Sequence, residues 1–280
     1  MDDPLDITAV TDQLTTRWLG RNCIYLPEVD STNNWLKAAL EQRSPAELPA
    51  GTLVITDYQS QGRGRLARRW EAPPRSSLLM TLLFRPDWPG ERANWLTMMA
   101  SLAAAEAMTA VTDLPVGLKW PNDLVIGPPG AWRKLGGMLL ETTFSAGGVL
   151  AAACLGLGLN VNISAADLPP TVTPATSLLQ ETGQPVDRHR LLAAFLTRLE
   201  EYYEAADRGR SPYPAWQARL VNIGHPVQVT DFVSQQTISG LAAGVNDWGH
   251  LLVVDEHGRR HTIMAGDVTL RPIDISAHSQ

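Results

Sequence analysis

The chain has 280 residues, 44% of them hydrophobic, and a formal net charge of −6 at pH 7. This length suits a large domain with a small partner domain, and the composition is that of a globular protein. The acidic balance argues against nucleic acid or an anionic membrane surface as the main partner. The only cysteines are Cys23 and Cys154, so neither a disulfide framework nor a zinc cluster is expected, and the cytosol is the default compartment. Neither a signal-peptide core nor a run of about 18 apolar residues occurs, so we expect no membrane anchor.

The N-terminal part contains one clear helix pattern. Residues 5–19 show only weak helical periodicity, and this stretch is too short for an added DNA-binding domain. The run VDSTNNWLKAAL predicts a helix with Ser31 or Thr32 as its N-cap and an apolar face made by Trp35, Leu36, Ala39 and Leu40. Ser31, Thr32 and Asn33 either only cap this helix, which the residues alone favour, or help to hold an anionic or carbonyl oxygen at its N-terminus.

The stretch GRGRLARRW, from Gly62 to Trp70, lies between two predicted strands, TLVITDYQ and SLLMTLLF. Glycine lets the backbone approach a ligand, and arginine forks bind carboxylate or phosphate, so the loop suits an anion site. A basic solvated loop is the alternative. A dinucleotide-binding fingerprint is not expected, because two prolines and a strand follow where that motif needs a helix, and a P-loop needs a Gly-Lys pair that the chain lacks. The loop contains four arginines: Arg63, Arg65, Arg68 and Arg69.

The central region combines a long helix with a polar corner. The helix is predicted over residues 91–111. The run PVGLKWPNDLVI then predicts two short strands joined by a turn that carries Lys119, Asn122 and Asp123. The chain contains three lysines against 20 arginines, and Lys119 and Lys134 lie close together in sequence. An ammonium is a compact point charge that reaches a phosphate or acyl-phosphate where a planar guanidinium cannot, with chance clustering as the alternative.

Two glycine-containing strands follow. In KLGGMLLE, Gly136 and Gly137 imply close approach of backbone or ligand, and Glu141 is expected to end the strand. The run VLAAACLGLGLNVN predicts a central strand with Asn160 at its polar end. A loop rich in proline and threonine is expected over residues 163–176.

The pattern changes near Val221. Residues 188–207 predict an amphipathic helix, and from residue 224 onward short alternating strands separated by turns predict a small β-barrel. We therefore divide the chain into a domain over residues 1–221 and a barrel over residues 222–275. The six histidines are dispersed and show no metal-ligand spacing.

Five motifs in order give the chain a family resemblance: VDSTN, YQSQGRGRLARRW, KWPNDL, KLGGMLLE and GLGLNVN. Over about residues 23–273 the chain resembles bacterial biotin protein ligase. The resemblance implies an α/β (α+β) fold, with a class II aminoacyl-tRNA synthetase-like catalytic domain, a mixed sheet flanked by helices, and a C-terminal SH3-like β-barrel. It implies that biotin and ATP form biotinyl-5′-AMP with Mg²⁺, and that biotin then passes to a lysine of the biotin carboxyl carrier protein of acetyl-CoA carboxylase.

The resemblance also implies roles for individual residues, and fixed positive charge is what two reacting anions require. Eight residues would bind biotin: Ser31, Thr32, Asn33, Gln59, Arg63, Gly64, Arg65 and Lys119. Five would act in catalysis: Arg63, Arg65, Lys119, Asp123 and Lys134. Five would bind the nucleotide: Arg65, Trp70, Asn122, Lys134 and Asn160. Asp123 would orient or deprotonate the incoming lysine or help to hold Mg²⁺, and these roles stay open at this point.

The chain departs from the family pattern at three places. Ala67 stands where many relatives have a glycine, and residues 163–176 offer no aromatic residue to cover adenine. We expect no N-terminal DNA-binding domain, hence a ligase that does not bind DNA or a membrane, with a homodimer left open. Two alternatives are a lipoate-protein ligase and a non-catalytic module that binds biotin or the carrier protein.

Overall fold

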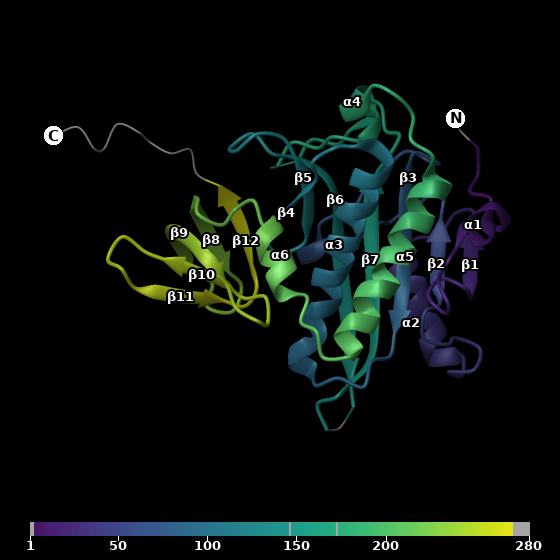
Figure 1. Cartoon of the computed structure of the whole chain (residues 1–280), viewed down its shortest axis with the longest axis horizontal. Coiled ribbons are helices and arrows are strands. Elements are labelled where there is room, and N and C mark those ends of the chain that lie inside the picture. Colours follow the sequence, from purple (N-terminus) through teal and green to yellow (C-terminus); the bar gives the residue numbers. More distant parts are fainter. Residues whose placement is uncertain (1–2, 146, 172, 271–280) are drawn as a thin grey trace.

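A mixed seven-stranded sheet forms the centre of the larger part of the molecule (Figure 1). The computed structural model describes residues 3–145, 147–171 and 173–270. β1 and β2 are parallel, and the other neighbouring pairs are antiparallel, which confirms the predicted mixed sheet. Across the sheet the strands are β1 (Cys23–Leu26), β2 (Leu53–Thr56), β3 (Ser77–Phe84), β7 (Leu150–Asn160), β6 (Arg133–Phe144), β5 (Asp123–Ile126) and β4 (Gly117–Lys119).

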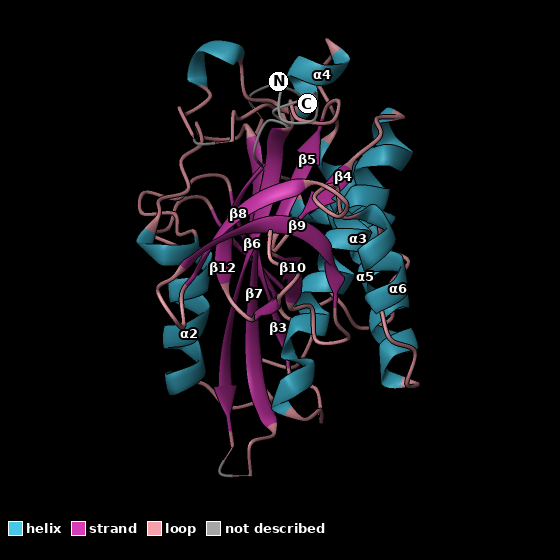
Figure 2. Ribbon diagram, turned by 90° about the vertical axis from the view of Figure 1, so that its left-hand side faces the viewer, coloured by secondary structure: helices cyan, strands magenta, loops and turns pink. Residues whose placement is uncertain are grey.

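Helices cover the two faces of this sheet unequally. Figure 2 shows α3 (Ala93–Thr112), α5 (Arg188–Asp207) and α6 (Tyr213–Arg219) on one side of the strands and α2 (Thr32–Gln42) on the other. The main hydrophobic core lies under α3 and α5, whereas α2 covers a much smaller cluster. The short helix α1 (Ile7–Gln13) packs against α5, and α4 (Leu178–Thr182) lies near the end of the sheet in Figure 1. Part of the α2 face therefore stays open for a cavity.

The predicted helices and strands agree with the structure except at a few boundaries. The helix over 188–207 is confirmed, and the helix expected from residue 91 begins at Ala93 because a 3₁₀ turn occupies the preceding residues. Helices α4 and α6 were not predicted, since five and seven residues are too few to show a helical period. Glu141 does not end β6, which continues to Phe144.

The start of α2 corrects the expected cap. Ser31 occupies the N-cap position with extended backbone, but its side chain makes no capping hydrogen bond. Thr32 is the first helical residue, and its hydroxyl turns toward Gln59 and Thr81 instead. The prediction that one of these hydroxyls caps the helix is therefore wrong, and the polar residues at this end are available for other contacts.

A five-stranded antiparallel sheet forms the C-terminal part, in keeping with the predicted SH3-like domain. Residues 260–270 supply two of its strands. Residues 271–275 of the expected barrel lie outside the described residues. Across this sheet the strands are β11 (Arg260–Ile263), β10 (Leu251–Val254), β9 (Thr237–Val245), β8 (Pro226–Asp231) and β12 (Gly266–Leu270).

A turn of the C-terminal part docks on the larger part. The indole N–H of Trp95 donates to the Asp247 carbonyl at 3.2 Å, and that of Trp120 donates to the Gly249 carbonyl at 2.8 Å. Trp120 is 2% exposed, so its hydrogen bond is shielded from water. The two parts are thus held together directly beside the Lys-Trp-Pro-Asn corner.

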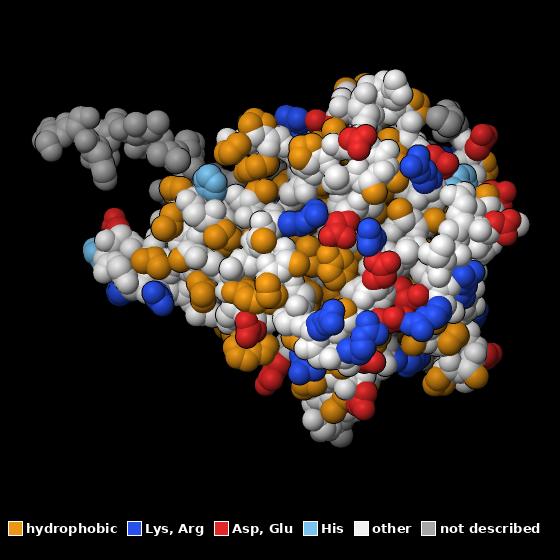
Figure 3. Space-filling view, in the orientation of Figure 1, with side chains coloured by type: hydrophobic (Ala, Val, Ile, Leu, Met, Phe, Trp, Pro, Cys, Tyr) orange, Lys and Arg blue, Asp and Glu red, His pale blue; other side chains and the backbone are white. Residues whose placement is uncertain are grey.

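Charged side chains of both signs are interspersed over α3 and α5 on the face shown in Figure 3. Glu106, for example, lies within 4 Å of both Arg198 and Arg219. Such exposed pairs contribute little stability each.

In the part of the chain that the structure describes, no helix combines the length and apolar character needed to cross a bilayer.

One buried ion pair joins four separate segments. Asp57, directly after β2, binds Arg188 of α5 at 2.8 Å, and both side chains are at most 6% exposed. The second carboxylate oxygen of Asp57 accepts from the Tyr25 hydroxyl at 2.7 Å and from the Leu5 backbone N–H at 3.2 Å. Burial and the hydrogen bond to Asp57 raise the pKa of Tyr25 to about 12. The pair therefore ties the N-terminal segment, β1, β2 and α5 together.

We predict that Asp57→Ala lowers the free energy of unfolding by about 3–5 kcal/mol, because it leaves the Arg188 guanidinium buried without its carboxylate. Urea unfolding of the variant and the wild type measures the difference. The matched control is Glu201→Ala, which breaks an exposed ion pair with Arg198 and should cost less than about 1 kcal/mol. Equal losses in the two variants would contradict the role of the buried pair.

Candidate active site

A cavity of about 420 Å³ lies on the α2 face of the sheet. Its floor is bare because glycines occupy facing positions on β6 and β7, where Gly137 pairs with Gly158. A Cβ atom at Gly156 would lie 2.3 Å from Asn33 Oδ1, and one at Gly158 would lie 2.5 Å from the Trp70 ring. Gly156 and Gly158 therefore make space for two side chains of the site itself.

The structure brings all of the residues predicted for the site to this one cavity. Sequence reasoning did not assign Arg68, Thr171 or Thr173, which also line it. The predicted residues among the lining are Ser31, Thr32, Asn33, Gln59, Arg63, Gly64, Arg65, Trp70, Lys119, Asn122, Asp123, Lys134 and Asn160.

One end of the cavity is polar and uncharged. Gln59 Oε1 accepts the backbone N–H of Thr32 at 2.8 Å and lies 3.1 Å from the Thr32 hydroxyl. Thr81, from β3, contacts both the Thr32 hydroxyl and Asn33 Oδ1. Side chains from α2, β3 and the end of the β2 segment thus form a hydrogen-bonded group that suits a neutral polar ring.

The arginine loop, residues 62–70, folds back on itself over the cavity. Trp70 N donates to the Gly62 carbonyl at 2.9 Å, and a Cβ atom at Gly62 would lie 2.3 Å from the Trp70 carbonyl oxygen, so this turn requires glycine. As predicted, no α-helix opens here, and the loop contains a single 3₁₀ turn, in which Leu66 has φ 56°. A positive φ at leucine is strained, which is typical of loops at functional sites.

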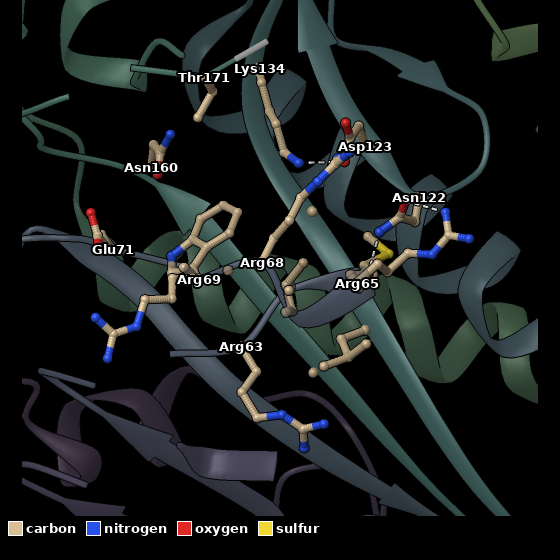
Figure 4. A pocket seen from close by; sticks show the side chains of 18 of the residues that line it. Arg63, Arg65, Arg68, Arg69, Glu71, Asn122, Asp123, Lys134, Asn160 and Thr171 are labelled. Atoms are coloured by element: carbon tan, nitrogen blue, oxygen red, sulfur yellow. Dashed lines mark hydrogen bonds and ion pairs between the residues drawn. The ribbon is translucent and has the colours of Figure 1, made fainter. Parts of the chain in front are cut away.

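The arginines of this loop point in different directions (Figure 4). Arg63 turns away from the centre and binds Glu141 at 3.1 Å and Asn34 at 2.8 Å. Arg65 donates to Asn122 at 3.3 Å and to a carbonyl of β12 at 3.4 Å. Arg68 extends across the cavity toward Asp123 in Figure 4. The loop sequence alone could not distinguish these orientations, which is why Arg68 was missed.

The opposite end of the cavity carries the two lysines. Lys134 Nζ lies 2.6 Å from Asp123 Oδ1 and 5.8 Å from the centre of the Trp70 ring. Lys119 donates to the Thr173 hydroxyl at 2.9 Å. The register of β5 on β6 places Asp123 opposite Gly137. The Asp123 carboxylate therefore contacts Lys134 above the glycines that form the floor of the cavity.

Positive charge dominates the cavity. Six basic side chains line it, namely Arg63, Arg65, Arg68, Arg69, Lys119 and Lys134, against two acidic ones, Glu71 and Asp123. A low-dielectric cavity with this imbalance attracts anions, and fixed cations stabilise the charge that develops when two anions react.

Asp123 offers a single carboxylate as a metal ligand, and this carboxylate is paired with Lys134. Among residues 3–145, 147–171 and 173–270, no three His, Cys, Asp or Glu side chains gather as a metal site. These residues do not form a protein cage for Mg²⁺, which commonly takes one or two carboxylates and several phosphate oxygens.

The fold and the site together define a class of protein. A cation-rich cavity with a polar end, on the open face of a mixed sheet, suits an enzyme that brings two anionic groups together.

Comparisons with known proteins narrow this class. Residues 25–160 match the biotin/lipoate A/B protein ligase family, and residues 223–271 match the biotin protein ligase C-terminal domain. The biotin–[acetyl-CoA-carboxylase] ligase of Mycobacterium tuberculosis is 33% identical over 272 residues, which cover 95% of both chains. The bifunctional ligase/repressor BirA of Bacillus spizizenii is 31% identical over 260 residues, which cover 92% of this chain and 76% of BirA.

A solved structure gives the same result. The biotin protein ligase from Aquifex aeolicus in complex with biotin and ATP superposes with a TM-score of 0.72 and 28% identity, over 90% of this chain and 99% of that one. The chain therefore belongs to the biotin/lipoate A/B protein ligase family, which confirms the resemblance found from the five motifs.

We predict that Gly158→Ala displaces the Trp70 ring and lowers the free energy of unfolding by about 1–3 kcal/mol, because the added methyl group overpacks the floor. Urea unfolding and tryptophan fluorescence measure the two effects. Gly147→Ala is the matched control, since a Cβ atom there meets nothing within 4 Å. If Gly158→Ala behaves like this control, the floor is not closely packed.

Proposed function

We propose that this protein is a biotin protein ligase, which activates biotin with ATP and transfers it to a lysine of the biotin carboxyl carrier protein of acetyl-CoA carboxylase. The observation that carries the proposal is a single cavity with a neutral polar end at Thr32 and Gln59 and a cationic end at Lys119 and Lys134. Biotin has the same polarity, with a ureido ring at one end and a carboxylate at the other. The family membership and the biotin- and ATP-bound relative support this assignment.

In the first step the biotin carboxylate attacks the α-phosphorus of ATP, and pyrophosphate leaves. Both reactants are anionic, so the step requires fixed cations on both sides of the reacting atoms. We assign Lys119 to the carboxylate, and Arg65, Arg68 and Lys134 to the phosphates. Trp70, beside Lys134, supplies a flat surface for the nucleotide. We further assign Asn122 and Asn160 to the nucleotide, because both line the cavity.

In the second step the amine of the carrier lysine attacks the acyl carbonyl, an amide bond forms and AMP leaves. Beyond the roles expected for Asp123 from the sequence, we propose that it orients Lys134, because its carboxylate lies 2.6 Å from that ammonium. Mg²⁺, which neutralises phosphate charge when bound, would be held mainly by the phosphates with Asp123 as a single protein ligand.

We also propose the cellular setting. The reaction consumes ATP, so we place it in the cytoplasm. The acidic net charge disfavours DNA as a partner, and we expect ligase activity without operator binding. Residues 1–221 would form the catalytic domain and residues 222–275 the C-terminal domain. Specific binding of the purified chain to a biotin-operon promoter would overturn the proposal for DNA.

Pyrophosphate exchange into ATP tests the proposed function directly. Purified protein with Mg²⁺ is expected to catalyse exchange when biotin is added and not when lipoate is added. Exchange with lipoate alone would make the protein a lipoate ligase, and no exchange with either, in folded protein, would leave a binding module.

We predict that Lys119→Arg lowers biotin-dependent exchange by about 100-fold or more, because a planar guanidinium cannot take the place of a compact ammonium at the reacting carboxylate. The exchange assay at saturating ATP measures this. Arg198→Lys, an exposed substitution on α5, is the control and should leave the rate unchanged. Full activity of Lys119→Arg would exclude Lys119 from the chemistry.

A further inference from the structure

A chain of hydrogen bonds runs from the cavity to Glu141, a carboxylate on β6 that lies behind the lining residues. Thr32 Oγ1 lies 2.8 Å from Thr81 Oγ1, Thr81 Oγ1 contacts Asn33 Oδ1, and Asn33 Nδ2 lies 3.0 Å from Glu141 Oε2. Thr32, Thr81 and Asn33 are each at most 3% exposed. These side chains therefore have little access to bulk water as an alternative partner. The orientation of each hydrogen bond in the series thus depends on its neighbours.

The available protons fix the direction of these bonds. An ionised carboxylate only accepts, so the Asn33 atom facing Glu141 is the amide nitrogen and the atom facing Thr81 is the oxygen. This oxygen only accepts, so the single hydroxyl proton of Thr81 goes to Asn33. The Thr32 proton then has two acceptors in the protein, Thr81 Oγ1 and Gln59 Oε1. A lone pair of the Thr32 oxygen is what remains for a ligand in the cavity.

Glu141 keeps its negative charge in this position. Lys37 lies 2.8 Å from one carboxylate oxygen, and Arg63 lies 3.1 Å from both. Burial works against ionisation, but the hydrogen bonds from Lys37 and Asn33 and the charge of Arg63 outweigh it and lower the pKa of Glu141. Asn33 Nδ2 also lies 3.5 Å from the Leu139 carbonyl, so Glu141, at 3.0 Å and charged, is the stronger of the two acceptors that set the direction of these hydrogen bonds.

We propose that Glu141 is a positioning residue that sets the polarity of this chain, so that Thr32 accepts a hydrogen bond and the site selects a ligand with an N–H donor there. This inference rests on the proposed function, since the ring of biotin is a cyclic urea with two N–H groups. A ring oxygen in place of that N–H would put lone pairs of two oxygens against each other and leave both unsatisfied.

Two substitutions disrupt this series of hydrogen bonds in different ways. In Glu141→Gln the new amide can donate as well as accept, so the Asn33 side-chain amide can rotate and present its nitrogen to Thr81. The Thr81 hydroxyl can then donate to Thr32, and the Thr32 hydroxyl can donate to a ligand. Thr81→Val removes the central link while conserving volume. Thr81→Ser keeps the hydroxyl and should restore the selectivity. Glu106→Gln, a carboxylate on α3 that accepts from the Tyr202 hydroxyl at 2.7 Å, is the control.

The experiment measures dissociation constants by calorimetry for biotin and for the two analogues in which one ring N–H is replaced by oxygen. We expect the wild-type chain to bind biotin at least about tenfold more tightly than one of these analogues. This ratio should fall by about threefold or more in Glu141→Gln and Thr81→Val, and stay at the wild-type value in Thr81→Ser and Glu106→Gln. The maximal exchange rate at saturating biotin should stay at the wild-type value in the control Glu106→Gln.

The outcomes are separable. If the wild-type chain binds neither biotin nor the analogues, the proposed function fails. If it binds biotin and the selectivity ratio is the same in every folded variant, only the role of Glu141 fails. Parallel losses for biotin and both analogues, without a change of ratio, would reduce Glu141 to structural support. Circular dichroism monitors folding, and failure of both Glu141→Gln and Thr81→Val to fold would also overturn the proposal.

Discussion

Mutual repulsion of like charges is the constraint on which this structure depends. Six basic side chains surround one small cavity, and the fold must hold them there without letting them drive the walls apart. It does so by giving cations an oxygen partner, such as Glu141 for Arg63, Asp123 for Lys134 and the Thr173 hydroxyl for Lys119. The partners come from β6, from the first residue of β5 and from the loop after β7. The larger part of the molecule thereby converges on the charged cavity.

The C-terminal domain takes part in the same arrangement. A carbonyl of β12 accepts from Arg65, and Trp120 is held by the carbonyl of Gly249. Trp120 adjoins Lys119 in the chain, so the docking turn also restrains the corner that carries a lysine of the cavity. The domain is thus an integral part of the wall as well as a separate sheet.

The sequence predicted much of this organisation because its signals were local. Long apolar runs marked β3 and β7, helical spacing marked α5, and the glycine and arginine content of residues 62–70 marked an anion site. Side-chain directions were not predictable, since they depend on register between distant strands. Arg63 turns outward to Glu141 on a distant strand, and Arg68 follows a 3₁₀ turn with a positive φ at Leu66, and no local pattern shows either feature. The link between Asn33 and Glu141 crosses 108 positions and leaves no local signal.

The glycine floor has a consequence for how this pocket can change over time. Gly137, Gly156 and Gly158 have no side-chain atoms left to remove, so any single substitution at these positions adds volume. Point mutation at these three positions can therefore shrink the cavity but cannot deepen it. Variants that accept a larger acid would have to arise at lining positions that carry a side chain to shorten, such as Met80, Met138 and Leu157. The three glycines thus act as a one-way restriction on substrate size.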